Sequence, residues 1–173
     1  MVARAKQGDT AAYGEIVSLH QSVAARAAYL VTGNAADAEE VTQDAFVKAY
    51  NALGRFRDDA PFRPWLLRIV TNEALNRLKA VKRRPTVELT EAADRPSGDT
   101  ALSPEGAALA GEQRDMVRDA LAKLRDDDRL VISYRYFLDL SEAEMADALG
   151  IARGTVKSRL SRALERLREV MNG

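Results

Sequence analysis

Apolar residues recur at helical spacing along most of the chain, and no stretch shows the strict alternation of a half-buried strand. The first predicted helix follows Asp9-Thr10, a pair that favours a helix amino terminus, and ends at Gly33-Asn34. A second helix is predicted over about residues 36–53. Its inner face is expected to carry Val41, Ala45, Ala49 and Leu53.

The helical pattern is interrupted between two helix-rich parts of the chain. A third helix is predicted over about residues 61–82, with two prolines in the first turn, where proline is tolerated. Residues 85–112 then hold three prolines, three glycines, six acidic residues and one arginine, with no aromatic residue. This composition predicts a flexible acidic linker, and helicity is expected to resume at about Gln113. The predicted fold class is all-α, with two small helical domains at residues 1–84 and 113–173.

The composition narrows the classes of protein to which the chain can belong. It has no cysteine and one histidine among 173 residues, which excludes disulfides and thiolate chemistry and leaves no histidine cluster for a zinc site. No run of about 18 apolar residues could span a membrane, and the start MVARAKQGD lacks the apolar core of a secretory signal. We therefore expect a cytoplasmic protein that inserts in no membrane, is not an enzyme and uses no metal or cofactor.

The net charge is zero, but the charges occur in blocks. Residues 51–84 carry nine basic and three acidic side chains, whereas residues 85–130 carry six basic and eleven acidic ones. Basic surface is therefore expected near the end of each half of the chain, with acidic surface between. This distribution suits contact with nucleic acid despite the balanced total.

The segment SEAEMADALGIARGTVKSRL has the layout of a helix-turn-helix. Ser141 and Glu144 match a capping box at the start of a short helix, and Gly150 suits the left-handed turn after it. The next helix is basic and amphipathic, and Thr155 is expected to help cap it. Its buried face is expected to hold Val156, Leu160, Ala163, Leu164 and Leu167. A basic helix alone is more often a solvated surface helix, but the capped helix and the glycine turn before it favour DNA binding.

Two parts of the chain resemble conserved regions of bacterial RNA polymerase sigma factors of the extracytoplasmic-function (ECF) group. The stretch LSEAEMADALGIARGTVKSRLSRALERLRE resembles the fourth conserved region. NAADAEEVTQDAFVKAYNAL and RFRDDAPFRPWLLRIVTNEALNRLKA resemble the polymerase-docking and promoter-melting parts of the second region. The resemblance covers about residues 3–82 and 113–171. It implies a sigma factor that binds core RNA polymerase, directs it to specific promoters through minus-thirty-five and minus-ten elements, and assists DNA melting.

Acidic residues of the second predicted helix form a ridge, because Asp37, Glu40 and Asp44 lie on neighbouring turns. A solvated helix face is the simplest interpretation of such a ridge. The resemblance implies instead a contact with the clamp helices of the polymerase β′ subunit, and it implies the β flap as a second polymerase contact. The positions assigned to core polymerase are Asp37, Glu39, Glu40, Gln43, Asp44 and Phe46.

The loop RFRDDAPFRPW interleaves aromatic and basic side chains, a combination that binds single-stranded nucleic acid through stacking and phosphate contacts. Trp65 lies beside Leu66 and Ile69 and is expected to belong to the core instead. Asn72 and Asn76 lie one turn apart, and amides can bind the edge of a base that has left the stack. The resemblance implies that this region holds the minus-ten strand. The expected contacts are Arg55, Phe56, Arg57, Phe62, Arg63, Arg68, Asn72 and Asn76.

The second helix of the helix-turn-helix is expected to read the minus-thirty-five duplex. Base edges are assigned to Lys157, Ser158, Ser161 and Arg162. Phosphate contacts are assigned to Arg153, Thr155, Arg159 and Arg166. The resemblance also suggests control by an anti-sigma factor that covers both the polymerase-binding and the DNA-binding faces.

Two other classes of protein fit parts of the pattern. A stand-alone helix-turn-helix regulator that never contacts polymerase would have no use for a melting loop in its first domain. An enzyme with an attached DNA-binding domain would need a catalytic constellation, and the chain has no cysteine, a single histidine and no glycine-rich phosphate loop. The sigma factor is therefore the favoured interpretation.

Overall fold

The computed structural model describes residues 1–83 and 104–173, except for the side chains of residues 104–109. The amino-terminal half comprises α1 (Val2–Lys6), α2 (Thr10–Thr32), α3 (Ala35–Ala52), the 3-10 turn η1 (Leu53–Arg55) and α4 (Phe62–Arg83). The carboxy-terminal half comprises α5 (Pro104–Ala122), α6 (Asp126–Tyr136), α7 (Glu142–Leu149) and α8 (Arg153–Asn172). Every element in these ranges is helical, which confirms the predicted all-α fold class.

Helix α5 begins earlier than the sequence pattern indicates. It starts at Pro104, whereas the pattern places the return of helicity at about Gln113. Proline suits a first helical turn because the amide hydrogen that it lacks would have no partner there. Two glycines in GAALAGE weigh against a helix, but the alanines and the leucine around them favour one. The expected linker therefore ends before Pro104, and its remaining residues, 85–103, lie outside the described part of the chain.

Local capping interactions begin and end the first long helices where the pattern predicts. Asp9 Oδ1 accepts a hydrogen bond from the backbone amide of Ala12 at 2.9 Å at the start of α2. Gly33 ends α2 with φ of 67°, a left-handed conformation that disfavours any residue with a Cβ. Asn34 then caps α3 through its side-chain oxygen.

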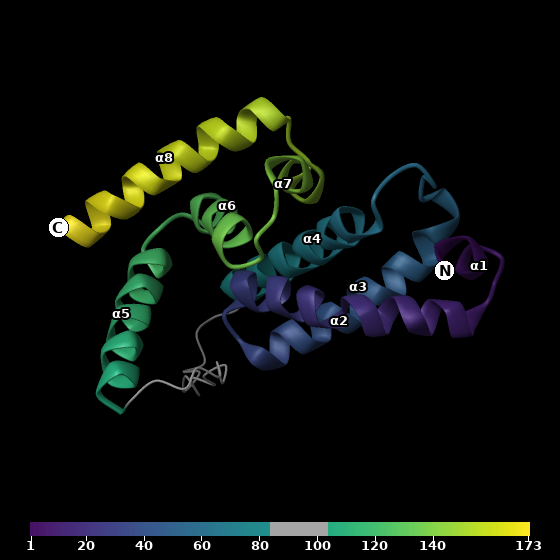
Figure 1. Cartoon of the computed structure of the whole chain (residues 1–173), viewed down its shortest axis with the longest axis horizontal. Coiled ribbons are helices and arrows are strands. Elements are labelled where there is room, and N and C mark those ends of the chain that lie inside the picture. Colours follow the sequence, from purple (N-terminus) through teal and green to yellow (C-terminus); the bar gives the residue numbers. More distant parts are fainter. Residues whose placement is uncertain (84–103) are drawn as a thin grey trace.

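Alanine residues allow α2, α3 and α4 to pack closely, side by side in Figure 1. The alanines with no exposed surface include Ala24, Ala27, Ala28, Ala45, Ala49 and Ala74. Larger side chains from α4 fill the space between the three helices, and Leu66, Leu67 and Val70 are fully buried. The predicted inner face of the second helix is confirmed, because Val41, Ala45 and Ala49 of α3 and Leu53 at the start of η1 are at most 3% exposed.

The helix-turn-helix is present at α7 and α8. Ser141 and Glu144 make both hydrogen bonds of the predicted capping box, and Gly150 takes the left-handed conformation with φ of 65°. In α8, Val156 and Ala163 are fully buried, and the leucines of the predicted stripe are half-buried against the same core. Thr155 is not a cap: α8 begins after Ala152, so that Thr155 lies within the first turn.

The two halves of the molecule pack against each other. Helices α2 and α4 contact α6 and α7, and one hydrophobic core runs through both halves. The hydroxyl groups of Thr71 on α4 and Tyr134 on α6 form a buried hydrogen bond across this boundary. At its edge, Lys82 Nζ lies 2.8 Å from Asp126 Oδ2.

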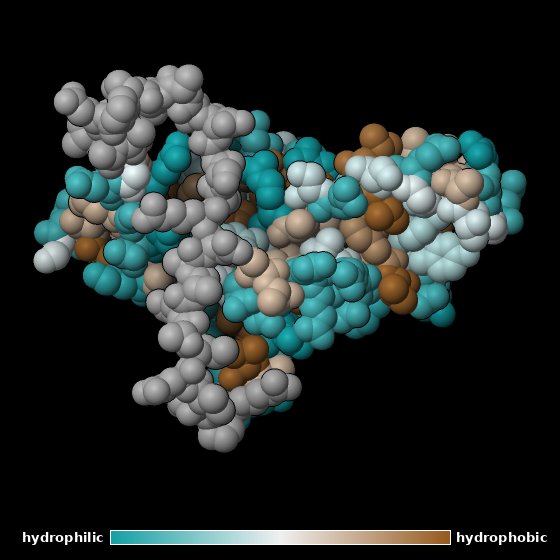
Figure 2. Space-filling model, turned by 90° about the horizontal axis from the view of Figure 1, so that it is seen from below, coloured by the Kyte–Doolittle hydropathy of each residue, from teal (hydrophilic) through white to brown (hydrophobic). Residues whose placement is uncertain are grey.

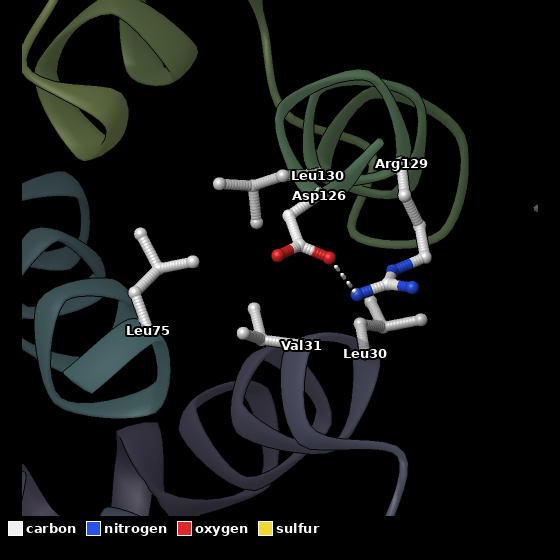
Figure 3. Close-up of a pocket in the computed structure, with 6 residues that line it drawn as sticks. All are labelled: Leu30, Val31, Leu75, Asp126, Arg129 and Leu130. Carbon is white, nitrogen blue, oxygen red and sulfur yellow. Dashed lines mark hydrogen bonds and ion pairs between the residues drawn. The ribbon is translucent and has the colours of Figure 1, made fainter. Parts of the chain in front are cut away.

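A small pocket marks the place where α2, α4 and α6 meet (Figure 3). Leu75 and Leu130 approach one another above the end of α2 in this view. Asp126 and Arg129 form an ion pair of 2.9 Å at the rim. The boundary between the halves is therefore apolar inside and charged at its margin. The residues that line the pocket are Leu30, Val31, Leu75, Asp126, Arg129 and Leu130.

Candidate polymerase-binding and nucleic-acid interfaces

The acidic ridge of α3 is partly neutralised within the molecule. Arg77 of α4 lies 2.9 Å from Asp37 Oδ1 and 2.6 Å from Glu40 Oε2. Glu39 and Gln43 are exposed and within hydrogen-bond distance of each other. Asp44 is exposed, and within residues 1–83 and 104–173 no basic side chain forms an ion pair with it. The sequence pattern gives no sign of the Arg77 contact, because it joins residues far apart in the chain.

Phe46 differs from the other five residues assigned to polymerase. It is 8% exposed, and its backbone carbonyl accepts a hydrogen bond from the hydroxyl of Tyr13. Burial raises the pKa of Tyr13 to about 12, so the hydroxyl stays protonated at neutral pH. Phe46 therefore offers little surface to a partner.

Sequence reasoning missed an apolar surface next to the ridge. Val47 is 61% exposed and Tyr50 is 41% exposed. Together with Thr10, Tyr13 and Phe46 they line a shallow hollow between α2 and α3. Figure 2 shows apolar residues reaching the surface toward the α1 end of the molecule. The available signal was an apolar residue, Val47, on the otherwise polar outer face of α3.

The aromatic residues of the loop RFRDDAPFRPW (residues 55–65), which resembles the promoter-melting segment, belong largely to the core. Phe56 is 5% exposed, and its ring centroid lies 4.9 Å from that of Trp65 and 5.5 Å from that of Phe62. The fold therefore does not offer Phe56 for stacking on a base, contrary to the sequence-based assignment. Alternating aromatic and basic residues predict an exposed loop, but the ring of Phe56, which directly follows η1, is buried in the core. Trp65 packs on both phenylalanines, as expected of a core residue.

The four arginines assigned to the minus-ten strand have different surroundings. Arg55 is exposed, and Arg57 forms a surface ion pair with Asp59 at 2.8 Å. Arg63 reaches the other half of the molecule, where its Nη2 donates to the backbone oxygen of Leu138 at 3.2 Å. Arg68 lies against Gly150, since a methyl group added to this glycine would lie 3.1 Å from Arg68 Nη2. Arg63 is therefore bonded to the carboxy-terminal half, and Arg68 lies close to it.

An exposed polar stripe follows the outer side of α4. Asn72 and Asn76 are both exposed, one turn apart, as the sequence predicts. Lys79 and Arg83 continue the same face at helical spacing and are also exposed. The stripe thus joins two amides to positive charge in a line along one helix.

Lys6 supports the loop that precedes this stripe, a role that sequence reasoning missed. Its ammonium group donates to the backbone oxygen of Phe56 and to Asp58 Oδ1 at 2.7 Å. It is therefore a cation from α1 that fastens the end of η1 and the start of the loop.

Six of the eight residues assigned to the minus-thirty-five duplex are exposed on α8. They are Arg153, Lys157, Ser158, Arg159, Ser161 and Arg162. Arg162 donates to the backbone oxygen of Ser158 at 3.3 Å, which places two assigned base readers in contact. Thr155 is half-buried in the first turn. Arg166 instead forms an ion pair with Asp128 of α6 at 2.7 Å.

No cluster of three or more candidate metal ligands occurs within the described ranges of the chain. Nor does any helix of these ranges have the length and apolar content to cross a membrane. The elements that remain are an acidic helix, an amide-bearing basic helix and a capped helix-turn-helix with a basic second helix. Together they define the class: a two-part, all-helical DNA-binding protein with an additional acidic surface suited to a protein partner.

Comparisons with known families identify both halves. Residues 16–84 match the family model for Sigma-70 region 2, and residues 114–167 match that for Sigma-70, region 4. The RNA polymerase sigma-H factor of Pseudomonas aeruginosa is 37% identical over 171 residues, which cover 95% of this chain and 89% of that protein. The ECF RNA polymerase sigma factor SigW of Bacillus subtilis is 32% identical over 176 residues, which cover 97% of this chain and 93% of that protein.

Solved structures agree in fold. The structure of CnrH in complex with the cytosolic domain of CnrY matches with a TM-score of 0.69 and 30% identity, over 99% of this chain and 94% of that one. The sigma factor RpoE from Bartonella quintana, solved with the anti-sigma factor NepR, matches with a TM-score of 0.70 over 92% of this chain and 96% of that one. At 24% identity the latter supports the fold alone. The chain belongs to the ECF group of RNA polymerase sigma factors, which bind core polymerase and direct it to promoters.

Proposed function

We propose that the chain docks on core RNA polymerase through α3, holds the minus-ten strand along α4 and reads the minus-thirty-five duplex with α8. The observation that carries this proposal is the presence of three separate surfaces of suitable chemistry on one chain of the sigma family. Asp44, Asn72 and Arg162 lie exposed on these three surfaces.

For polymerase docking, the exposed members of the ridge are the strongest candidates. A basic partner could bind directly to the exposed side chains of Glu39, Gln43 and Asp44. Asp37 and Glu40 would first have to lose their ion pairs with Arg77. We therefore propose that Asp44 contributes more to docking than Asp37 does.

For the minus-ten strand, the exposed amides and cations of α4 support the proposal. Asn72 and Asn76 present hydrogen-bonding groups suited to the edge of an unstacked base, with Lys79 available for a phosphate. Arg55 adds an exposed cation at the start of the loop. The buried Phe56 is proposed to support this loop from below.

Promoter binding would require the two halves to separate. Two elements centred about 25 base pairs apart lie roughly 85 Å apart on straight duplex. In this structure Arg68, which is assigned to the minus-ten element, lies beside Gly150, in the turn that leads into α8. Helix α8, which is assigned to the minus-thirty-five element, has 20 residues and spans only about 30 Å, much less than the distance between the two elements. We therefore propose that binding to polymerase or DNA breaks the contacts between α4 and α7.

The chain is proposed to act in the cytoplasm and to have no catalytic activity of its own, because the polymerase supplies the chemistry. An anti-sigma factor is proposed as its regulator, as the family resemblance implies. Such a partner would act by covering the docking and DNA-binding surfaces.

Run-off transcription with sigma-free core polymerase and a library of candidate promoters tests the proposal. Transcripts specific to certain promoters are expected with the unaltered chain, and these are expected to be lost with Asp44→Ala or Arg162→Ala. Asp119→Ala and Arg168→Ala are the matched controls, because both residues are exposed and lie outside the proposed surfaces. Sequence-specific DNA binding without polymerase, and no transcripts with any core enzyme, would favour the stand-alone regulator.

A further inference from the structure

Arg166 is paired with a buried carboxylate of α6, although 42% of its own side chain is exposed. Its Nη1 atom lies 2.8 Å from Asp128 Oδ1 and 2.7 Å from Asp128 Oδ2. The Asp128 side chain is 7% exposed, and Asp128 is among the few polar residues of the core. Arg125 also approaches this carboxylate, at 3.7 Å, but its side chain is 73% exposed. Arg166 is therefore the principal partner of a buried charge.

This ion pair restrains the rotation of α8 about its own axis. Within the described residues, no other hydrogen bond or ion pair joins α6 to α8, and apolar side chains of both helices, such as Leu130 and Ala163, belong to one core. Apolar contacts are not directional and tolerate small rotations. A buried carboxylate is costly without its partner, so rotations that carry Arg166 away from Asp128 are unfavourable. The directional contact thus selects one rotational setting of the helix.

The same setting determines where the assigned base readers lie. Ser158, Arg162 and Arg166 follow one another at intervals of four residues, so they form a row along one side of α8. Arg162 also contacts Ser158 in this row. When Asp128 fixes the last member, it fixes the direction in which the other two project.

We propose that Asp128 and Arg166 are positioning residues that orient α8 for reading the minus-thirty-five duplex. This inference rests on the proposed function of α8. It replaces the phosphate contact that sequence reasoning assigns to Arg166. Asp128 enters the DNA-reading machinery although it is buried on a different helix.

The two roles of Arg166 predict opposite effects of Asp128→Asn. If Arg166 contacts a phosphate, removing the carboxylate frees a cation for DNA, and binding to every sequence becomes tighter. If Arg166 positions α8, the same change loosens the helix, and the preference for the correct sequence falls. Asparagine has nearly the shape of aspartate, so this variant tests the charge with little change in packing.

The experiment uses holoenzyme assembled from sigma-free core polymerase and the full chain. Its probes are a promoter duplex selected by the unaltered holoenzyme from a randomised library and the same duplex with a scrambled minus-thirty-five element. Affinities are measured over a series of salt concentrations for the unaltered chain, Asp128→Asn, Arg166→Gln and the double variant. Arg159→Gln is the reference for a phosphate contact, because Arg159 is exposed on the same side of α8.

We expect each single variant to lower the ratio of the two affinities about tenfold, the size of one lost base contact. The double variant should be no worse than either single one, since both changes remove the same interaction. Arg166→Gln should leave the dependence of affinity on salt unchanged, whereas Arg159→Gln should lower its logarithmic slope by about one.

A lower salt slope in Arg166→Gln, with both duplexes weakened alike and tighter binding by Asp128→Asn, would overturn the positioning role. So would full discrimination between the duplexes in all the variants. Failure of the unaltered holoenzyme to discriminate between the duplexes would overturn the proposed reading by α8, and the positioning role with it.

Folding is checked by the helical circular dichroism signal and its melting curve for each variant. If Arg166→Gln does not fold, Arg166→Lys takes its place, because lysine keeps the charge on a side chain that is one bond shorter. Lysine would serve as well for a phosphate, so preserved discrimination would overturn the proposal. Reduced discrimination with an unchanged salt slope would support it.

Discussion

The phenolic hydroxyl of Tyr134 donates a hydrogen bond to the hydroxyl of Thr71, across the boundary between the two halves of the molecule. The direction follows because Thr71 gives its own hydrogen to the backbone oxygen of Leu67 at 2.6 Å. Both side chains are buried, at 0% and 2% exposure. Burial raises the pKa of Tyr134, so the donor keeps its proton throughout the neutral range. This buried polar contact thus joins α6 to α4 within the core that the two halves share.

Replacing Tyr134 by phenylalanine should weaken this boundary without changing its packing. The loss expected in the free energy of unfolding is about 0.5–1.5 kcal/mol, the net value of one hydrogen bond. Urea unfolding of the full chain measures it. Tyr136→Phe is the control, because Tyr136 lies on the same helix with 59% of its surface exposed. Equal stability of the two variants would contradict a bond across the boundary.

The ion pair between Lys82 and Asp126 should make stability depend on pH. The hydrogen bond from Lys82 lowers the pKa of Asp126 below its usual value of 3.8. The ionised carboxylate is therefore favoured by folding, and this contribution is complete above pH 3.8 and is lost as the pH falls through the lower folded pKa.

The measurement compares unfolding of the unaltered chain and Asp126→Asn over a pH series. The unaltered chain should be the more stable near neutrality, and the difference should shrink in acid. Asp127→Asn is the matched control, because Asp127 lies in the same first turn of α6 but is exposed. A difference that grows toward low pH would contradict the ion pair.

Gly150 should resist substitution because of its backbone conformation. At φ of 65° an alanine costs roughly 1–2 kcal/mol, and the new methyl group would also have to displace Arg68. We expect Gly150→Ala to lower the melting temperature. Gly154→Ala provides the contrast, since Gly154 lies in α8 with open space around it. It should be neutral or add up to about 1 kcal/mol of stability.

Phe56→Ala tests whether this residue is core or a base-stacking residue. Removing a buried phenylalanine typically costs about 3–5 kcal/mol, partly because a cavity is left behind. We expect a loss of this size in urea unfolding without any DNA present. Phe137→Ala should cost less, because 42% of Phe137 is exposed. If Phe56→Ala lowered the free energy of unfolding only slightly, Phe56 would again be a candidate for stacking on a base.

The sequence by itself determined the local features of this protein. The caps at Asp9 and Ser141, the turn at Gly150 and the buried stripe of α8 depend on residues within a few positions of one another. Their spacing therefore carries the information needed to predict them. The exposed flank of α8 that carries Arg162 was found in the same way, from the periodicity of a single helix, whereas Asn72 was assigned from its amide chemistry and the family resemblance.

Only the tertiary structure decided which charged and aromatic side chains are free. Arg77 forms ion pairs with two carboxylates of the α3 ridge, and Asp128 forms an ion pair with Arg166. Phe56 is buried in the core. The ion pairs join helices 37 to 40 residues apart in the chain, and Phe56 shares a core with residues of α1, α2 and α4. No periodicity within one helix encodes these contacts. The cost of an unpaired buried charge and the gain from burying a ring select these partners only once the helices have packed.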